Sequence, residues 1–282
     1  MAIVDWAKQS GDVRALRVQP AKKTPVARDA TQQQQLGVSY DTSSLEVSVL
    51  EKQPIERARA RLRASLVGFV WDAAALEGNT FTLPEVQTLL DGVTVGGKSI
   101  HDEKQVLALR DAFVELDRLV ESKTFRLDKT TSDRLHAIVA PGEAIEAGHF
   151  RGEGHAKGGG VVSLGERGVY KASAPGPGGK NLLAEYRSLT NYLAGVSDPR
   201  EQALVYFAAA TRRQFYFDGN KGVARLMMNG HLMAHGYDAI SVSANRRVEF
   251  NEYLVTLFDT GNATDLLAFT LDSRPKDGDS SS

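Results

Sequence analysis

Hydrophobic residues recur along most of the chain at the spacing of a helix. Apolar side chains three and four residues apart predict amphipathic helices, because such positions fall on one face. The pattern predicts helices over residues 55–69, 82–90, 99–120, 132–139, 181–193, 199–215, 223–235 and 246–258. Thr82, Pro84 and Glu85 strengthen the second of these, since Thr82 can cap the helix and Glu85 can complete a capping box.

One segment departs from the helical pattern. Two short runs with β-branched residues, 161–164 and 169–172, flank a turn that begins and ends with Gly165 and Gly168. Such runs around a glycine-containing turn predict a β-hairpin. The chain is therefore expected to be all-α, a helical bundle that carries one small exposed hairpin.

The two ends of the chain differ in composition from the segment between them. Residues 1–45 mix Gln, Lys, Arg, Asp and Ser with little periodicity, which predicts a flexible N-terminal arm. This arm is mildly basic, and a solvated tail is favoured over a binding arm. Residues 273–282 are polar and predict a disordered tail. One domain is expected between them, over residues 46–272.

Composition narrows the classes of function. The chain has 35 Asp and Glu against 34 Lys and Arg, so it has no overall field that would draw it onto nucleic acid, and no specific nucleic-acid partner is expected. The absence of cysteine excludes disulfides, thiolate zinc sites and cysteine nucleophiles. No apolar run approaches the length of a membrane span, and the N-terminus lacks a secretory signal. We expect a cytoplasmic protein with no membrane partner.

The loop before the helix at 223–235 carries the candidate chemistry. A glycine-containing loop that leads into a helix brings free backbone amides and the positive end of the helix dipole to one point, which suits an anion. Asp218 offers a hard oxygen ligand for Mg²⁺, and Lys221 and Arg225 add positive charge. A plain interhelical turn in which Asp218 caps the helix is the alternative.

Residues 214–225 resemble the Fic motif HxFx(D/E)GN(G/K)(R/K)xxR of the Fic/Doc (Fido) family. Asp218, Gly219, Asn220 and Arg225 match the motif, and Tyr216 replaces its Phe. Upstream, residues 73–79 resemble the inhibitory motif (S/T)xxxE(G/N) of the family, in an inhibitory-helix segment near 64–79. The resemblance covers roughly residues 54–271 and implies a Fic-type helical bundle whose hairpin is the family's flap.

The resemblance also implies roles for individual residues. Most Fic proteins transfer AMP from ATP to a Ser, Thr or Tyr hydroxyl of a protein, whereas Doc-type members transfer phosphate, which is the less favoured activity here. ATP and Mg²⁺ are the implied cofactors, with Asp218 as the metal ligand and Glu77 as the inhibitory residue that pairs with Arg225. The implied nucleotide-binding and phosphate-binding residues are Gly219, Asn220, Lys221, Gly222 and Arg225, and the implied flap residues that bind the target are Val161, Val162, Ser163 and Leu164.

The chain departs from the family at places where the chemistry depends on the residue. Gln214 stands where the family has the histidine that removes the proton from the target hydroxyl. Loss of a general base costs on the order of 10² to 10⁴ in rate, although Gln214 can still position a hydroxyl. Lys221 stands where most AMP transferases have Gly and resembles the Doc variant. Gly222 lacks the usual charge, and Ala73 replaces Ser or Thr.

Other histidines do not offer an evident replacement for the missing base. His231 and His235 should lie two and three turns into the following helix, away from the loop. His149 and His155 lie near the hairpin, but nothing in their spacing indicates convergence on the loop. Each is interpreted as an ordinary surface or core histidine.

Two functions follow from the sequence. The first is a nucleotide-binding Fido protein, related to protein AMP transferases, with weak, altered or lost activity toward an unidentified target protein. The alternative is a non-catalytic protein-binding module on a Fic fold, for which the departures at Gln214, Gly222 and Ala73 argue. A homo-oligomer and secretion as an effector are left open. An introduced His→Gln change would give the same sequence, although the other departures favour a natural Gln214.

Overall fold

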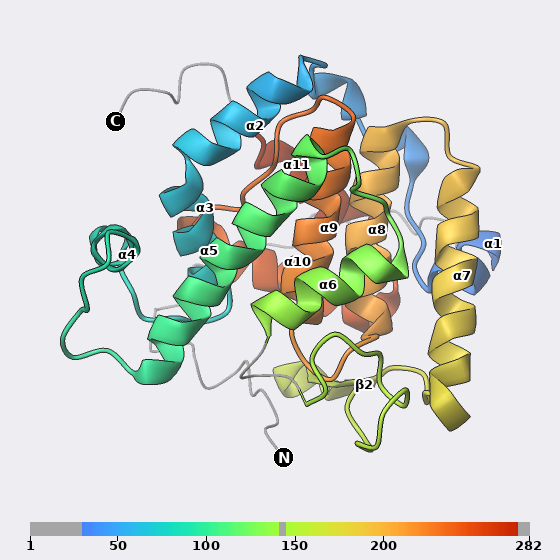
Figure 1. The fold of residues 1–282 in the computed structure, drawn as a ribbon. Coiled ribbons are helices and arrows are strands. Elements are labelled where there is room, and N and C mark those ends of the chain that lie inside the picture. The colour runs from blue at the N-terminus through green and yellow to red at the C-terminus, as the bar shows by residue number, and fades with distance from the viewer. Residues whose placement is uncertain (1–29, 141–144, 276–282) are drawn as a thin grey trace.

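The computed structural model describes residues 30–140 and 145–275 of the chain. It is mostly helical with one two-stranded antiparallel sheet, which confirms the predicted fold class (Figure 1). The helices are α1 (Ala30–Leu36), α2 (Ile55–Ala64), α3 (Leu66–Leu76), α4 (Leu83–Leu90), α5 (Ile100–Glu121), α6 (Lys129–Val139), α7 (Lys180–Ala194), α8 (Pro199–Arg213), α9 (Asn220–Ala234), α10 (Arg247–Thr260) and α11 (Thr264–Asp272). The strands are β1 (Val161–Ser163) and β2 (Val169–Lys171).

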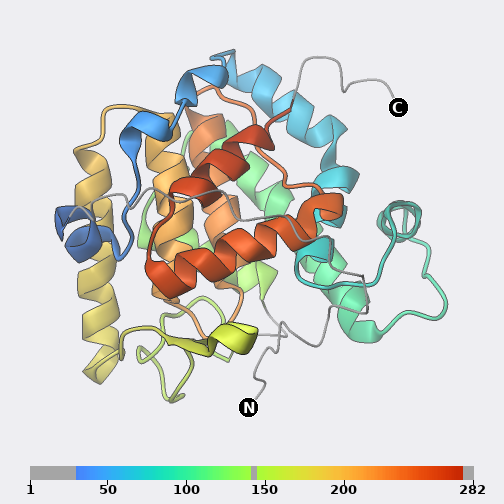
Figure 2. The ribbon, with the colours of Figure 1, turned by 180° about the vertical axis from the view of Figure 1, so that it is seen from behind.

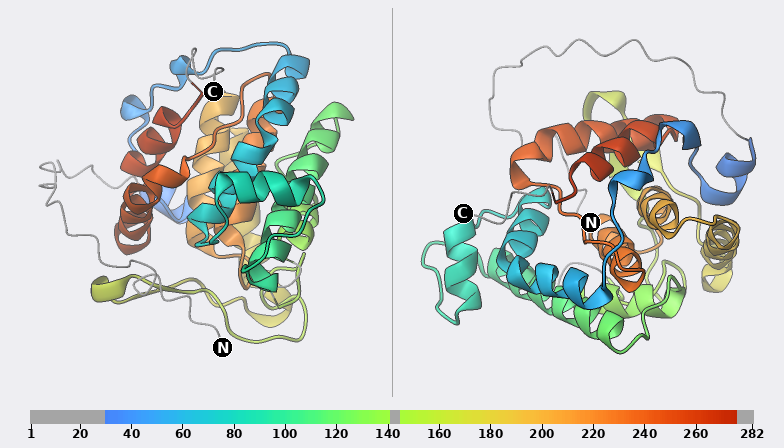
Figure 3. Two further views of the ribbon diagram at one scale, coloured as in Figure 1. Left: turned by 90° about the vertical axis from the view of Figure 1, so that its left-hand side faces the viewer. Right: turned by 90° about the horizontal axis from the view of Figure 1, so that it is seen from above.

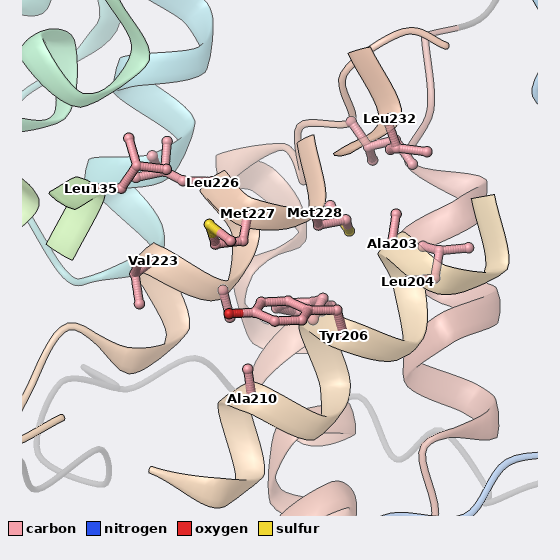
Figure 4. Close-up of a cluster of buried hydrophobic side chains, with 14 of the residues drawn as sticks. Leu135, Ala203, Leu204, Tyr206, Ala210, Val223, Leu226, Met227, Met228 and Leu232 are labelled. Carbon is pink, nitrogen blue, oxygen red and sulfur yellow. The ribbon is translucent and has the colours of Figure 1, made fainter. Parts of the chain in front are cut away.

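Helices α8 and α9 form the centre of the molecule. All residues from Ala203 to Thr211 in α8 are buried, and α9 is buried on nearly every side, including its polar residues Asn220, Lys221, Asn229 and His231. Figure 4 shows their side chains meeting, with Tyr206 of α8 facing α9 and Leu135 of α6 joining from a neighbouring helix. Helices α5 and α6 cover this pair on one face, and α10 and α11 cover it on the other (Figures 1 and 2).

The predicted helix over residues 55–69 is wrong in one respect, because the chain forms two helices there. Ser65 separates α2 from α3 and has φ −105° and ψ 13°, outside helical values. The break follows the change in composition, since α2 is rich in Arg whereas α3 is apolar. Within α2, Arg59 is buried and pairs with Asp117 at 2.7 Å.

Residues 30–45 are packed against the domain and correct the expected boundary of the flexible arm. Leu36 and Val38 are fully buried, and Ser39 forms a parallel bridge with Asn262. Hydrophobic side chains that are sparse in the sequence, such as these two, are enough to anchor the segment. Residues 1–29 of the predicted arm, and residues 276–282 of the predicted tail, lie outside the described residues.

The predicted hairpin is present and lies at one end of the helical bundle (Figure 3). Val161 pairs with Lys171 and Ser163 with Val169. The hairpin rests on α10, where the Tyr170 ring packs on Phe258 with 5.2 Å between ring centroids. In residues 30–140 and 145–275, no helix has the length and apolar character needed to cross a membrane.

Candidate active site

A cavity opens where the hairpin, the loop between α8 and α9, and α10 meet. The hairpin contributes Val161–Leu164, and the loop with the start of α9 contributes Gln214 and Phe217–Gly222. Glu77, directly after α3, lies on another side. The cavity therefore brings together every site residue predicted from the sequence except Arg225, which does not line it but contacts Glu77.

The loop between α8 and α9 is held in shape by Asn220. The Asn220 Oδ1 accepts from the Tyr216 N–H at 2.8 Å, and its Nδ2 donates to the Tyr216 carbonyl at 2.9 Å. Because Asn220 is buried, these bonds satisfy polar groups that water does not reach. Its amide is thereby committed to the backbone of the loop, which gives it a positioning part in addition to the nucleotide contact expected from the motif.

His136 of α6 packs against the same loop, and the sequence did not predict this contact. Its ring stacks on Tyr216 at 3.8 Å, Nδ1 accepts from the Gly148 N–H at 2.8 Å, and Nε2 lies 2.9 Å from the Asp218 carbonyl oxygen. With Nδ1 an acceptor, the proton must be on Nε2, which donates to that carbonyl. His136 is fully buried, and burial lowers its pKa to about 4, so the ring is neutral at pH 7.

Arg151 ties the hairpin to the loop and was also given no role of its own by the sequence. Its guanidinium donates from Nε to the Gln214 carbonyl at 2.7 Å and from Nη2 to the Ser173 carbonyl at 3.2 Å. The side chain is almost completely buried. A buried Arg between a hairpin and a loop fixes their relative position, because each donor lost would leave a buried carbonyl unpaired.

Gln214 ends α8 in the left-handed backbone conformation, with φ 52° and ψ 56°. Its side-chain Nε2 donates to the Thr211 carbonyl at 2.8 Å, and its Oε1 accepts from Asn220 Nδ2 at 3.3 Å. The amide is therefore oriented at the cavity wall by the helix end and by the loop. An amide oriented in this way can accept a hydrogen bond but cannot take up a proton at neutral pH.

Asp218 is the carboxylate nearest to the start of α9. Its Oδ1 accepts from the Gly219 N–H at 2.7 Å. Burial raises the pKa of the Asp218 carboxyl, and the nearby Glu77 adds to the rise. In the described part of the chain, no three His, Asp or Glu side chains gather as a metal-binding group.

Glu77 is paired with two cations at once. Its Oε1 lies 3.1 Å from Arg225 Nη2, as the resemblance implied, and its Oε2 lies 3.0 Å from Lys221 Nζ, which the sequence did not indicate. Glu77, Lys221 and Arg225 are called the ion-pair cluster below. Burial lowers the pKa of the Lys221 ammonium, and the Glu77 charge opposes this change.

Gly222 leaves space in the first turn of α9. A Cβ built on Gly222 would meet no atom within 4 Å. A larger side chain therefore has room at this cavity-lining position. The fold would accommodate a Lys or Arg there, but the chain has Gly.

The histidines considered as replacements for the missing base lie elsewhere. No histidine of the described residues lines the cavity. His231 is buried against Gln202, with Nε2 2.7 Å from its Oε1, and His235 packs on His231. His149 and His155 are exposed. Their interpretation as ordinary core or surface residues agrees with these positions.

Some known proteins are similar to this chain in sequence. No family model matches the chain. Protein adenylyltransferase Fic of Aedes aegypti is 25% identical over 196 residues, which cover 68% of this chain and 37% of that protein. Protein adenylyltransferase Fic of Drosophila ananassae is 24% identical over 241 residues, covering 84% and 46%. The chain thus spans less than half the length of these curated relatives.

Solved structures share the arrangement of helices. A Fic domain-containing signalling protein from Bacteroides thetaiotaomicron gives a TM-score of 0.61 at 22% identity, covering 86% of this chain and 90% of that one. Fic-1 from C. elegans gives a TM-score of 0.60 at 18% identity, covering 78% and 67%. Both likenesses establish the fold. Taken with the curated relatives, they show that the chain is similar to Fic proteins in sequence and shares their fold.

Proposed function

We propose that the cavity binds ATP with Mg²⁺ and that the protein is a nucleotide-binding Fic protein whose transfer of AMP to a protein hydroxyl is weakened by Gln214. The observation that supports this most is the meeting of Asp218, Lys221 and the start of α9 in one cavity. A helix N-terminus with a nearby ammonium group suits phosphate.

The residues present fit a magnesium ion. Mg²⁺ is usually bound by one or two carboxylates together with phosphate oxygens of the substrate, and Asp218 supplies one carboxylate. Because burial raises the pKa of that carboxyl, a cation beside it would stabilise its charged form. Bound there, the ion would neutralise part of the phosphate charge.

Gln214 limits the chemical step in this proposal. In AMP transfer, the hydroxyl oxygen of the target forms a bond to the α-phosphorus, the bond to the bridging oxygen breaks, and pyrophosphate leaves. The hydroxyl proton needs an acceptor, which the Gln214 amide does not provide. The oriented amide oxygen can still accept a hydrogen bond from the hydroxyl and hold it near the cavity.

The ion-pair cluster opposes nucleotide binding in the resting protein. Glu77 forms ion pairs with Lys221 and Arg225, which both belong to α9. A phosphate group must compete with this carboxylate for both, and the Glu77 charge also repels it. Glu77 is therefore proposed as the inhibitory residue, with Lys221 as a second cation under its control.

Calorimetry with ATP and Mg²⁺ on the Glu77→Gly variant tests the proposal. Release of two charge-assisted contacts should make binding at least about tenfold tighter than in the unaltered protein. Asp218→Asn in the same background is the control and should remove the dependence on Mg²⁺. Absence of binding by Glu77→Gly at millimolar ATP would reject a nucleotide site.

A non-catalytic protein-binding module is the second candidate. It is favoured by the absence of histidine from the cavity lining in the described residues, and by the exposed Val161 and Val169 on the hairpin. An extended target segment could add to an exposed strand edge. Capture of the target that depends on residues 161–172 but is unaffected by ATP would favour this function over the first.

A further inference from the structure

Arg151 binds both ends of the hairpin and the loop between α8 and α9 through one guanidinium. Its Nη1 donates to the Gly159 carbonyl before β1 at 3.4 Å, and its Nη2 donates to the Ser173 carbonyl after β2 at 3.2 Å. Its Nε donates to the Gln214 carbonyl at 2.7 Å. The side chain is buried, so water does not replace these contacts. Three segments therefore share one rigid, planar group.

The backbone that leads into β1 lies directly against this guanidinium. A Cβ on Gly159 would be 2.8 Å from Arg151 Cδ, and a Cβ on Gly160 would be 2.5 Å from Arg151 Cζ. Both glycines also have positive φ, 73° and 71°, which other residues rarely adopt. This end of the hairpin therefore cannot shift toward the loop without displacing the guanidinium.

The main chain of Arg151 adds a second link to the loop. Its N–H donates to the Phe215 carbonyl at 2.8 Å, and the Gln214 carbonyl just before it accepts from Nε. One residue thus holds two consecutive carbonyls of the loop. Because the backbone sets the direction of a side chain, the placement of the Gln214 amide at the cavity wall depends on Arg151.

Other contacts of the hairpin reach different helices. The Tyr170 ring packs on Phe258 of α10, and the Arg212 guanidinium of α8 lies 4.8 Å from the centre of the same ring. A two-stranded hairpin is only marginally stable alone, so its position depends on contacts of this kind. Arg151 ties that position to Gln214.

We propose that Arg151 couples the position of the hairpin to the position of Gln214. A target segment that adds to the hairpin edge would then lie at a fixed distance from the residue that holds its hydroxyl. Arg151 is a positioning residue, because it does not line the cavity and acts through backbone carbonyls. The step that involves the target rests on the proposed function, whereas the coupling itself is a property of the protein without nucleotide or target.

Amide hydrogen exchange of the full chain without nucleotide tests the coupling. Gly160→Ala places a Cβ against the guanidinium. It should speed exchange of the Tyr216 N–H in the loop about tenfold, as expected from the loss of a hydrogen bond to a charged group. Gly158→Ala is the matched control. Gly158 has φ 96°, but a Cβ there would meet no atom within 4 Å, so this change should strain the same segment and leave the Tyr216 rate nearly unchanged.

Arg151→Lys completes a double-mutant cycle. Lys keeps the charge but lacks the planar fork. In this background, Gly160→Ala should have almost no further effect on the Tyr216 exchange rate, because the group that transmits the displacement is gone. Exchange of the Leu204 N–H in the buried part of α8 should not respond to Gly160→Ala, which separates coupling from a general loss of stability.

Transfer of AMP gives a second readout. In the protein with Glu77→Gly and Gln214→His, adding Arg151→Lys should lower the transfer rate at saturating ATP about tenfold or more, because misplacing a reacting group by about 1 Å can cost 10² in rate. The affinity for ATP should stay the same, since Arg151 does not line the cavity.

Equal effects of Gly160→Ala and Gly158→Ala on the Tyr216 exchange rate would overturn the coupling, whichever ligand the cavity binds. Additive effects of Gly160→Ala and Arg151→Lys would do the same. A parallel loss of transfer and of ATP affinity on Arg151→Lys would overturn the positioning role. Absence of transfer before Arg151 is changed, with coupling present in the exchange rates, would overturn the proposed function and support the coupling.

Discussion

At the scale of single residues, Gln214 changes the chemistry of the loop while keeping its backbone. The left-handed conformation at φ 52° is uncommon for residues other than glycine, but Asn, Asp and His adopt it more often than most. A histidine could therefore occupy the same backbone without new strain. A change of Gln214 to His would therefore alter proton transfer and not the backbone of the loop.

Lys221 shows what the sequence could not reveal about a single residue. Its spacing in the motif indicated a cation near the loop, and the structure places it there. Its ion pair with Glu77 joins residues far apart in the chain, so no local pattern could predict it. The contact between His136 and the loop could not be predicted for the same reason, because a position within a helix does not indicate which loop packs against it.

Protonation of His136 should make stability depend on pH. Its pKa is about 4 in the folded protein and about 6.5 when unfolded, so the unfolded state binds more protons between these values. The free energy of unfolding should therefore fall as pH drops from about 6.5 to 4, by about 3 kcal/mol from this residue. Urea unfolding at several pH values would measure the fall.

His136→Gln provides the comparison. Burial lowers the pKa of His231 as well, to about 3, but His231 is present in both proteins and its contribution cancels. The variant should be less stable at pH 7, and the gap should narrow toward pH 4. Parallel pH profiles for the two proteins would contradict a neutral buried His136.

At the scale of elements, the loop between α8 and α9 depends on Asn220. The side chain pairs with both backbone groups of Tyr216, so Asn220→Leu should leave two buried polar groups unpaired. The expected loss is about 2–4 kcal/mol in the free energy of unfolding. Asn245→Leu makes the same chemical change at an exposed residue and should stay within about 0.5 kcal/mol of the unaltered protein. Equal effects of the two changes would show that Asn220 does not hold the loop.

The end of α3 is held by cations from two other helices. Lys221 donates to the Leu76 carbonyl at 3.2 Å, Arg225 to the Ala73 carbonyl at 3.5 Å, and Arg247 to the Ala75 carbonyl at 3.3 Å. These carbonyls are at the negative end of the helix, where positive charge is favourable. The position of Glu77 thus follows from how α3 ends, in addition to its own ion pairs.

At the scale of the molecule, periodicity predicted most helices and the hairpin because both patterns are local. The break at Ser65 and the packed segment at residues 30–45 were not predicted, since each depends on contacts with distant parts of the chain. The motif predicted which residues gather in the cavity. It could not indicate how Arg151 joins the loop to the hairpin, because these segments meet only after folding.

The central claim is that the main defect of this cavity is the absence of a general base at Gln214. The most direct test is the transfer of labelled AMP from ATP to the protein itself, with Glu77→Gly compared to Glu77→Gly combined with Gln214→His. Restoring a group that titrates near neutral pH should raise the rate by on the order of 10² or more. An unchanged rate, with nucleotide binding intact, would contradict the claim and place the defect outside Gln214.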